Sequence, residues 1–296
     1  MSGYLRVCGL LMLWCVCFGQ TGAPPSSEAV SELRARAGKG EAAAQYLLGR
    51  AYVEARDVPR DFSEAARWYR KAADQGYAEA QNALGFLYDN GQGVPQDHSE
   101  AARWYRKSAD QGLADAEFNL GSLYDTGQGV TQDHAEAARW YRKAAGHGDL
   151  DAAFDLGVMY EQGQGVAHDE SEAARWYRKA AEAGIPIAQT ALAALYADGR
   201  GVLRDPAEAV LWLRKAAEQG FAPALRGLGA AYAEGRGVTQ DDVAAYMWMD
   251  LAVLRARGPL REQCSTERGA LARKMTAQQV AAAERRALEW KKKWTQ

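Results

Sequence analysis

Six tryptophans recur at a constant interval of 36 residues: Trp68, Trp104, Trp140, Trp176, Trp212 and Trp248. A fixed period between ~20 and ~50 residues is typical of stacked structural repeats. Dividing the chain on this period gives six repeats with no insertion between them: 42–77, 78–113, 114–149, 150–185, 186–221 and 222–257. Because a stacked array grows along one axis, the 296 residues need not form separate globular domains.

Each repeat is predicted to begin with a helix that buries one face. In the second repeat, Ala80, Leu84 and Tyr88 are four residues apart, which places them on one side of a helix. A Gly-x-Gly-Val turn at Gly91–Val94 is predicted to end this helix, because glycine readily adopts a left-handed conformation. The first repeat lacks this motif: Ala55 stands where the other repeats have the first glycine of the turn. No Gly-Lys-Ser/Thr follows the turn, so it does not indicate a phosphate-binding loop.

A second helix is predicted after each turn. An aspartate begins it in every repeat: Asp61, Asp97, Asp133, Asp169, Asp205 and Asp241. A glutamate follows three residues later in the first five repeats, a spacing that predicts reciprocal capping of the free backbone amides. These carboxylates are therefore interpreted as caps and not as catalytic groups. Within the second repeat, Trp104 is expected to be buried, whereas Arg103 and Arg106 are expected to point outward.

Segments without the repeat flank the array. An apolar run from Val7 to Phe18 follows the lone charge of Arg6, which predicts a signal peptide over residues 1–19. A stable membrane span needs ~20 apolar residues, so this run is too short for one. Residues 20–31 are predicted to be a linker and residues 32–41 an N-terminal capping helix. Residues 258–296 are predicted to form C-terminal capping helices with a polar outer side.

Cleavage after Gly19 predicts a periplasmic or secreted protein with no membrane span. A lipid anchor on Cys15 or Cys17 is a less favoured alternative, because a bulky residue precedes each cysteine. The mature chain would keep only Cys264, so neither an internal disulfide nor a Cys-x-x-Cys site is expected.

The repeats resemble the Sel1-like repeat family, a relative of tetratricopeptide arrays. Three features carry the resemblance: the Ala-x-x-x-Leu-Gly-x-x-Tyr helix, the Gly-x-Gly-Val turn and the Glu-Ala-Ala-x-Trp-Tyr-Arg-Lys segment at 100–107 and 136–143. The resemblance implies an all-α, right-handed superhelical solenoid of helical hairpins with a C-terminal helical cap. It also implies an adaptor role in bacterial envelopes or, in eukaryotic members, in ER protein degradation.

The resemblance leaves two function classes open. The first is a scaffold that binds a protein or peptide without catalysis. The alternative is an envelope hydrolase of β-lactamase type, as described for cysteine-rich secreted members. This chain has no cysteine in its repeats, and it lacks the Ser-x-x-Lys, Ser-Asp-Asn and Lys-Thr-Gly motifs of serine β-lactamases. We therefore expect no enzymatic activity, catalytic residue or cofactor.

The partner-binding surface is predicted from the variable positions of the first helices. In related arrays this helix lines the concave face, and here that face carries aromatic residues and a column of acids. The candidate residues are Tyr46, Phe86, Asp89, Phe118, Asp125, Phe154 and Glu161, and the acidic column also includes Glu54, Asp198 and Glu234. Aromatic anchors next to carboxylates suit a peptide with basic residues. Alternatively, the rings pack between hairpins and the acids are ordinary helix-end charges.

Other ligand classes are not indicated. The formal net charge of −2 gives no cationic excess for binding nucleic acid. His98 and His134 occupy the same position in successive repeats, too far apart to share a metal ion, and His147 and His168 have no partner at a metal-binding spacing. All four histidines are expected to be solvated, and no metal site is expected.

Overall fold

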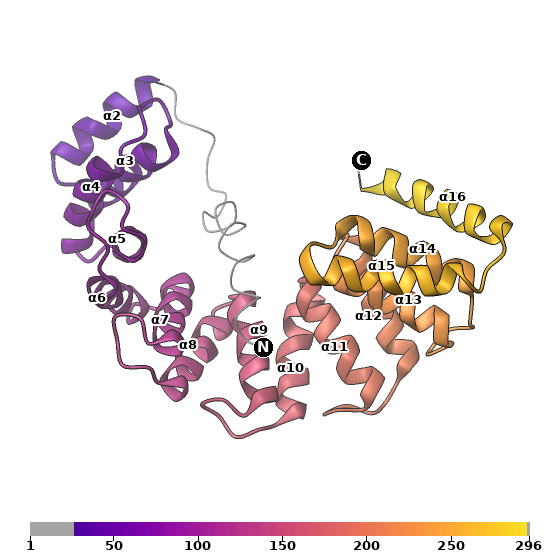
Figure 1. The fold of residues 1–296 in the computed structure, drawn as a ribbon. Coiled ribbons are helices and arrows are strands. Elements are labelled where there is room, and N and C mark those ends of the chain that lie inside the picture. The colour runs from indigo at the N-terminus through magenta and orange to yellow at the C-terminus, as the bar shows by residue number, and fades with distance from the viewer. Residues whose placement is uncertain (1–26, 295–296) are drawn as a thin grey trace. The chain divides into compact units, whose positions relative to one another are not determined.

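A computed structural model describes residues 27–294 of the chain (Figure 1). These residues form fifteen helices and no strand, which confirms the all-α repeat architecture. The predicted signal peptide, residues 1–19, lies outside the described residues. Contacts divide the chain into two units, residues 1–149 and 150–296. None of the helices in the described part is long and apolar enough to cross a membrane.

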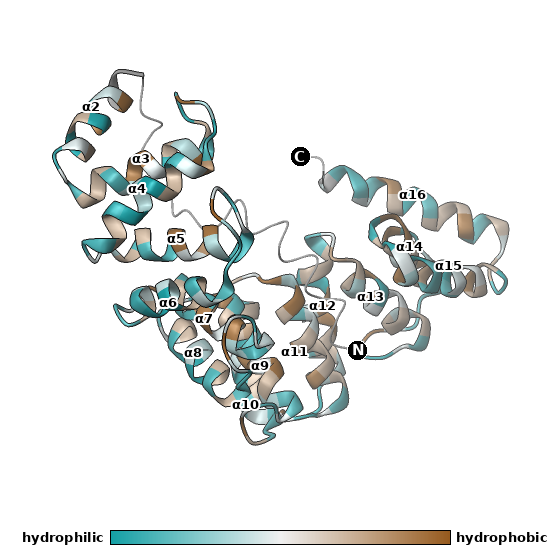
Figure 2. Ribbon diagram, turned by 60° about the vertical axis from the view of Figure 1, so that its left-hand side comes forward, coloured by the Kyte–Doolittle hydropathy of each residue, from teal (hydrophilic) through white to brown (hydrophobic). Residues whose placement is uncertain are grey.

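Every repeat is a hairpin of two helices of nearly equal length. The first helices are α3 (Ala42–Glu54), α5 (Ala78–Asn90), α7 (Ala114–Thr126), α9 (Leu150–Gln162), α11 (Pro186–Asp198) and α13 (Ala222–Glu234). The second helices are α4 (Phe62–Asp74), α6 (His98–Ala109), α8 (His134–Gly146), α10 (Glu170–Glu182), α12 (Pro206–Glu218) and α14 (Asp242–Arg255). Within each unit, a helix packs against the one before and the one after it in the chain. Figure 2 shows apolar residues (brown) interspersed with polar residues (teal) along these helices.

Three further helices lie outside the repeats. Helix α2 (Ser27–Gly38) packs on α3, and it begins inside the segment predicted as a linker, five residues before the predicted cap. Helix α2 begins this early because Val30 and Ala37, two helical turns apart, are both buried against α3. At the other end, α15 (Gly258–Ala272) and α16 (Ala277–Lys293) both pack on α14.

The aspartate caps are present, but the predicted reciprocal capping is wrong. In the second repeat, Asp97 Oδ1 accepts hydrogen bonds from the amides of Ser99 and Glu100. Glu100 does not return the interaction, because the amide of Asp97 donates to the carbonyl of Tyr88 instead. The Glu100 carboxylate pairs with Arg103 one turn later. A reciprocal box does form at the start of α16, where Thr276 and Gln279 cap each other's backbone amides.

A close contact between glycine and tyrosine fixes the distance between the two helices of a hairpin. A Cβ atom at Gly121 on α7 would lie 2.8 Å from Cδ1 of Tyr141 on α8, and Gly49, Gly85 and Gly157 face a tyrosine in the same way. In the fifth repeat Ala193 replaces the glycine, and Leu213 stands where the first four repeats have tyrosine; the sixth repeat places Gly229 against Met249. In the first four repeats the glycine therefore makes room for the tyrosine ring of the second helix.

Replacing Gly121 by alanine is expected to lower the free energy of unfolding by ~1–3 kcal/mol, because the added methyl group overpacks the contact with Tyr141. The higher helix propensity of alanine, up to ~1 kcal/mol, offsets only part of this cost. The Tyr141→Leu change should remove most of the penalty, since it reproduces the Ala193–Leu213 pair. Urea unfolding of the wild type, both single variants and the double variant measures the coupling. An equal cost of Gly121→Ala in the wild type and in the Tyr141→Leu variant would contradict this account.

Arginine joins successive repeats of the first unit. The Arg106 guanidinium lies over the ring of Trp140 in the next repeat, 5.0 Å from Cζ to the ring centroid, and donates to the hydroxyl of Tyr124. Arg70 makes the same two contacts, with Trp104 and Tyr88. Arg106 is partly buried, so the prediction that it points outward is wrong. An arginine that stacks on an indole and binds a phenol couples adjacent hairpins through dispersion, charge and a hydrogen bond.

Candidate partner-binding surface

The seven predicted surface residues all lie on first helices. Five belong to the first unit and two, Phe154 and Glu161, to the second. All seven are partly buried, so none is a freely exposed side chain. Counting from the first residue of each repeat, the aromatic residues occupy positions 5 and 9 of the first helix, whereas three of the acids occupy position 12.

In the first, third and fourth repeats, position 5 carries an aromatic ring that packs against a tyrosine of the second helix. The ring centroid of Phe118 lies 5.5 Å from that of Tyr141, and the ring centroid of Phe154 lies 5.5 Å from that of Tyr177. Tyr46 contacts two tyrosines, at 5.7 and 5.4 Å, and partial burial raises its pKa to about 12. Tilted ring pairs at these centroid distances are favourable. The rings are therefore held in fixed orientations while part of each remains accessible.

Phe86 differs from these three rings. It occupies position 9 on α5 and packs against the buried clusters of two successive hairpins, one containing Leu84 and Tyr69 and the other containing Leu120 and Tyr105. For this residue the structure agrees with the alternative in which a phenylalanine packs between hairpins. The accessible part of its ring remains at the surface of the first helices.

The acids at position 12 are paired within the chain. Asp89 Oδ1 lies 2.7 Å from Nδ1 of His98, and Asp125 Oδ1 lies 2.8 Å from Nδ1 of His134. About 30% of each histidine side chain is exposed. The prediction that these two histidines are solvated is therefore corrected: each links the end of a first helix to the start of the second.

Glu161 is the centre of a larger network in the second unit. The hydroxyl of Tyr177 donates to Glu161 Oε2 at 2.6 Å, and Arg200 Nη1 donates to Glu161 Oε1 at 2.8 Å. Burial, together with the hydrogen bond to this carboxylate, raises the pKa of Tyr177. The same carboxylate raises the pKa of Arg200 by accepting its hydrogen bond. Glu161 is thus held by a phenol and a guanidinium.

The predicted acidic column is not a single surface feature. Asp89, Asp125 and Glu161 occupy repeat position 12, whereas Glu54, Asp198 and Glu234 occupy position 13, about 100° further around a helix. The second group is paired as well: Glu54 with Arg50, Asp198 with Arg200, and Glu234 with Arg236. Most of these partners were missed because they follow the first helix, in the turn or on the second helix, whereas Arg50 lies on α3 itself. The spacing of nine residues from Asp89 to His98, repeated from Asp125 to His134, is the signal that could have revealed them.

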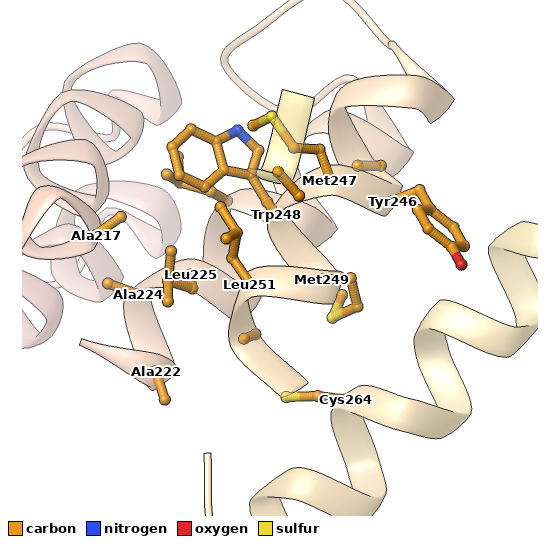
Figure 3. Close-up of a cluster of buried hydrophobic side chains, with 14 of the residues drawn as sticks. Ala217, Ala222, Ala224, Leu225, Tyr246, Met247, Trp248, Met249, Leu251 and Cys264 are labelled. Atoms are coloured by element: carbon orange, nitrogen blue, oxygen red, sulfur yellow. The ribbon is translucent and has the colours of Figure 1, made fainter. Parts of the chain in front are cut away.

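The described residues contain no group of three or more histidine, cysteine, aspartate or glutamate side chains placed to hold a metal ion. Cys264 is fully buried, and burial raises the pKa of its thiol, which does not favour a nucleophilic thiolate. Figure 3 shows Cys264 beside the buried side chains of α14. What the first-helix surface offers chemically is a set of fixed aromatic rings with carboxylates at one end of each helix.

Comparisons with known proteins show which family has this architecture. The sequence model of the Sel1 repeat family matches residues 42–77, 78–113, 114–149, 150–185, 186–221 and 222–255. No curated protein sequence matches the chain. A Sel1 repeat protein from Oxalobacter formigenes has a similar crystal structure, with a TM-score of 0.72 and 36% sequence identity over 78% of this chain and 94% of that one. The protein c5321, described as a protective antigen of uropathogenic Escherichia coli with an SLR fold, has a TM-score of 0.56 and 29% identity over 92% of this chain and 74% of its own. Because the repeat model matches six consecutive segments that span 42–255, the chain belongs to the Sel1 repeat family.

Proposed function

We propose that the protein is an exported, non-catalytic scaffold that binds a protein or peptide partner through the surface of its first helices. The observation that carries the proposal is the set of position-5 rings, Tyr46, Phe118 and Phe154, each supported by a tyrosine of the second helix. A ring held in one orientation loses little conformational entropy on binding, which makes it an efficient anchor. Aromatic anchors contribute much of the binding energy at protein interfaces.

A partner with basic residues fits the charge of the array. Residues 42–257 contain 31 aspartates and glutamates against 23 lysines and arginines. Although the acids at position 12 are paired locally, the array as a whole keeps a net negative charge. Such a field accelerates association with a basic partner and makes the rate sensitive to salt.

Export rests on the sequence of residues 1–19. An alkaline phosphatase fusion to these residues tests it, because that enzyme gains activity only after transport out of the cytoplasm. Activity of the fusion in intact cells is expected, and its loss when Leu10, Leu11 and Leu13 are changed to aspartate should follow.

The combined change of Tyr46, Phe118 and Phe154 to alanine is expected to abolish partner capture in pull-downs from the native cell envelope. Because these rings are partly buried, a second variant with leucine at the three positions keeps the packing and removes only the aromatic faces. Both variants should retain the helical circular dichroism spectrum. The matched control changes Arg103, Arg139 and Arg175 to alanine, since these residues are exposed on the second helices. Loss of the partner in the control but not in the leucine variant would mean that the interface lies on the second helices.

A further inference from the structure

The two C-terminal helices carry a charge opposite to that of the repeats. Residues 258–296 contain 9 lysines and arginines against 4 aspartates and glutamates, whereas residues 42–257 contain 23 against 31. A cap over the end of an array needs a polar outer side, but it needs no particular sign of charge. Covering the last repeat therefore does not explain the excess of cations.

Ion pairs with the sixth repeat do not remove this excess. Glu267 of α15 accepts hydrogen bonds from Arg226 of α13, the shortest at 2.6 Å. Arg268 pairs with Asp250, and Arg286 Nη1 lies 3.9 Å from Asp241 Oδ2. These contacts use two cations of the cap and one of its acids. Five other cations of the cap are exposed: Arg261, Arg273, Lys274, Arg285 and Lys292.

Part of the excess gathers where α14 ends, α15 begins and α16 ends. Trp294 Nε1 donates to the carbonyl of Glu218 at 2.9 Å, and Cζ of Arg255 lies 4.9 Å from the ring centroid of Trp294. These contacts hold the end of α16 beside the end of α14. The chain then enters α15, whose N-terminus is the positive end of the helix dipole. We call this surface the basic end, and it consists of Arg255, Arg257, Arg261, Lys291 and Lys292.

Acids are fewer than cations in these segments. Glu218, Glu262 and Glu289 belong to them, against the five cations of the basic end. The basic end therefore keeps a net positive charge.

The sixth repeat differs from the other five at this surface. Position 33 is aspartate, glycine or glutamate in the first five repeats and leucine, Leu254, in the sixth. Position 34 changes from glutamine, histidine or alanine to Arg255, and position 36 changes from an apolar residue or aspartate to Arg257. The last repeat thus acquires one apolar side chain and two arginines next to the cap.

Two exposed leucines border these cations. Leu254 is 51% exposed and directly precedes Arg255, whereas Leu288 is 57% exposed and lies one turn before Lys291 on α16. Leucines flanked by cations are typical of helices that lie on a membrane, where the apolar side chains enter the acyl boundary and the cations bind headgroups. A protein interface instead has an apolar core with few charges. Leucines bordered by charge therefore favour a lipid surface over an acidic protein.

We propose that the basic end docks on an anionic phospholipid surface, with its cations on the headgroup phosphates and Leu254 and Leu288 at the acyl boundary. Attachment of this kind needs no membrane-spanning helix. The proposal goes beyond partner binding and does not depend on the position-5 rings, because its residues all belong to α14, α15, α16 and the link between α14 and α15.

The test uses the chain from Gln20 to Gln296, which contains all the described residues and lacks the apolar run of the predicted signal peptide. Co-sedimentation measures its binding to vesicles of phosphatidylcholine containing one third phosphatidylglycerol, and to vesicles of phosphatidylcholine alone. Binding to the anionic vesicles is expected to be at least ~tenfold tighter at low salt. High salt should remove most of the difference, because it screens exposed charges.

Variants locate the surface. The combined change of Arg257, Arg261 and Lys292 to alanine should weaken binding to the anionic vesicles at least ~tenfold, because each cation near the surface adds to the affinity. The matched control changes Arg103, Arg139 and Arg175 to alanine. It removes the same charge from exposed side chains of the second helices, so it should bind as the wild type does. Leu254→Gln leaves the charge unchanged and should weaken binding several-fold. Circular dichroism checks that every variant is folded.

Soluble polyglutamate distinguishes an acidic protein from a membrane. It should compete only weakly with the anionic vesicles, because it offers the charge without an apolar phase for the leucines. Equal binding to the two kinds of vesicle, equal losses in the two triple variants, or wild-type affinity in Leu254→Gln would overturn the proposal. Binding of polyglutamate without binding of vesicles would assign the basic end to an acidic protein instead. None of these outcomes changes the pull-down test of the position-5 rings, so the two proposals fail separately.

Discussion

Replacing Trp140 by alanine is expected to lower the free energy of unfolding by ~3–5 kcal/mol, the usual cost of removing a large buried aromatic side chain. Trp140 is only 4% exposed and packs with Tyr105, Leu120 and Leu123. Its Nε1 donates to Glu136 at 2.9 Å, and the guanidinium of Arg106 covers its ring. The variant therefore loses hydrophobic burial, a hydrogen bond and the contact that joins two repeats. Urea unfolding monitored by circular dichroism measures the change.

Two further variants separate these contributions. Trp140→Phe keeps most of the buried area and removes the Nε1 hydrogen bond, so it should cost clearly less than alanine. Trp68→Ala should also cost less, because Trp68 is partly exposed in the first repeat. A shift below ~1 kcal/mol for Trp140→Ala would mean that the second helices present a different face to the core.

The repeat architecture followed from the sequence because each of its determinants is local or periodic. The burial of Ala80 and Leu84 depends on spacing along one helix, and the Asp97 cap depends on amides two and three residues away. The 36-residue spacing of the tryptophans then shows that this local arrangement recurs in all six repeats. Where the prediction of Arg106 failed, the partners Tyr124 and Trp140 lie in the next repeat, and a pattern within one hairpin does not reveal them.

A hydrogen-bonded pair of glutamines, one of them buried, shows another limit of sequence patterns. Gln81 on α5 is buried, donates to the carbonyl of Ala73 at 3.1 Å and accepts from Gln111 Nε2 at 2.7 Å. Glutamine at repeat positions 4 and 34 looks like ordinary surface composition in any one repeat. Across the repeats, however, the two positions change together, to Glu117 with His147 and to Ala153 with Ala183. Comparison of the repeats with one another, at positions thirty residues apart, is the signal that identifies such contacts.

The candidate surface was predicted less completely than the fold. The 36-residue period puts Tyr46, Phe118 and Phe154 at equivalent positions of the first helix, because it fixes position 5. It did not show that tyrosines of the second helix support these rings. Nor did it show that Asp89 is already paired with His98, since that contact depends on how the turn between the helices folds back. Pairing across a turn is a tertiary property, and the charge pattern of one helix does not contain it.

The second large loss of stability is expected at the turns of the first unit, where a glycine packs against the backbone of the preceding repeat. Gly129 has a φ of +70°, and a Cβ atom there would lie 2.2 Å from the backbone carbon of His98 in the preceding repeat. The adjacent Ser99 hydroxyl donates to the carbonyl of Gly129 at 3.2 Å, which holds the two backbones together. Gly93 makes the same approach to Phe62. In the first repeat, which has no preceding repeat to contact, Asp57 occupies this position with a φ of +53°.

Gly129→Ala is therefore expected to lower the free energy of unfolding by ~3 kcal/mol or more, from left-handed backbone strain plus the overlap with His98. Gly127→Ala is the matched control. Gly127 has a similar φ of +72°, and the first repeat carries Ala55 at that position with a φ of +57°. Its Cβ would meet Gln132 Cβ at 3.0 Å, a side-chain contact that can move, so a cost of only ~1 kcal/mol is expected. Urea unfolding of both variants gives the comparison. Equal losses would show that left-handed strain alone accounts for the glycine, and that the turns do not pack against the preceding repeat as closely as the structure indicates.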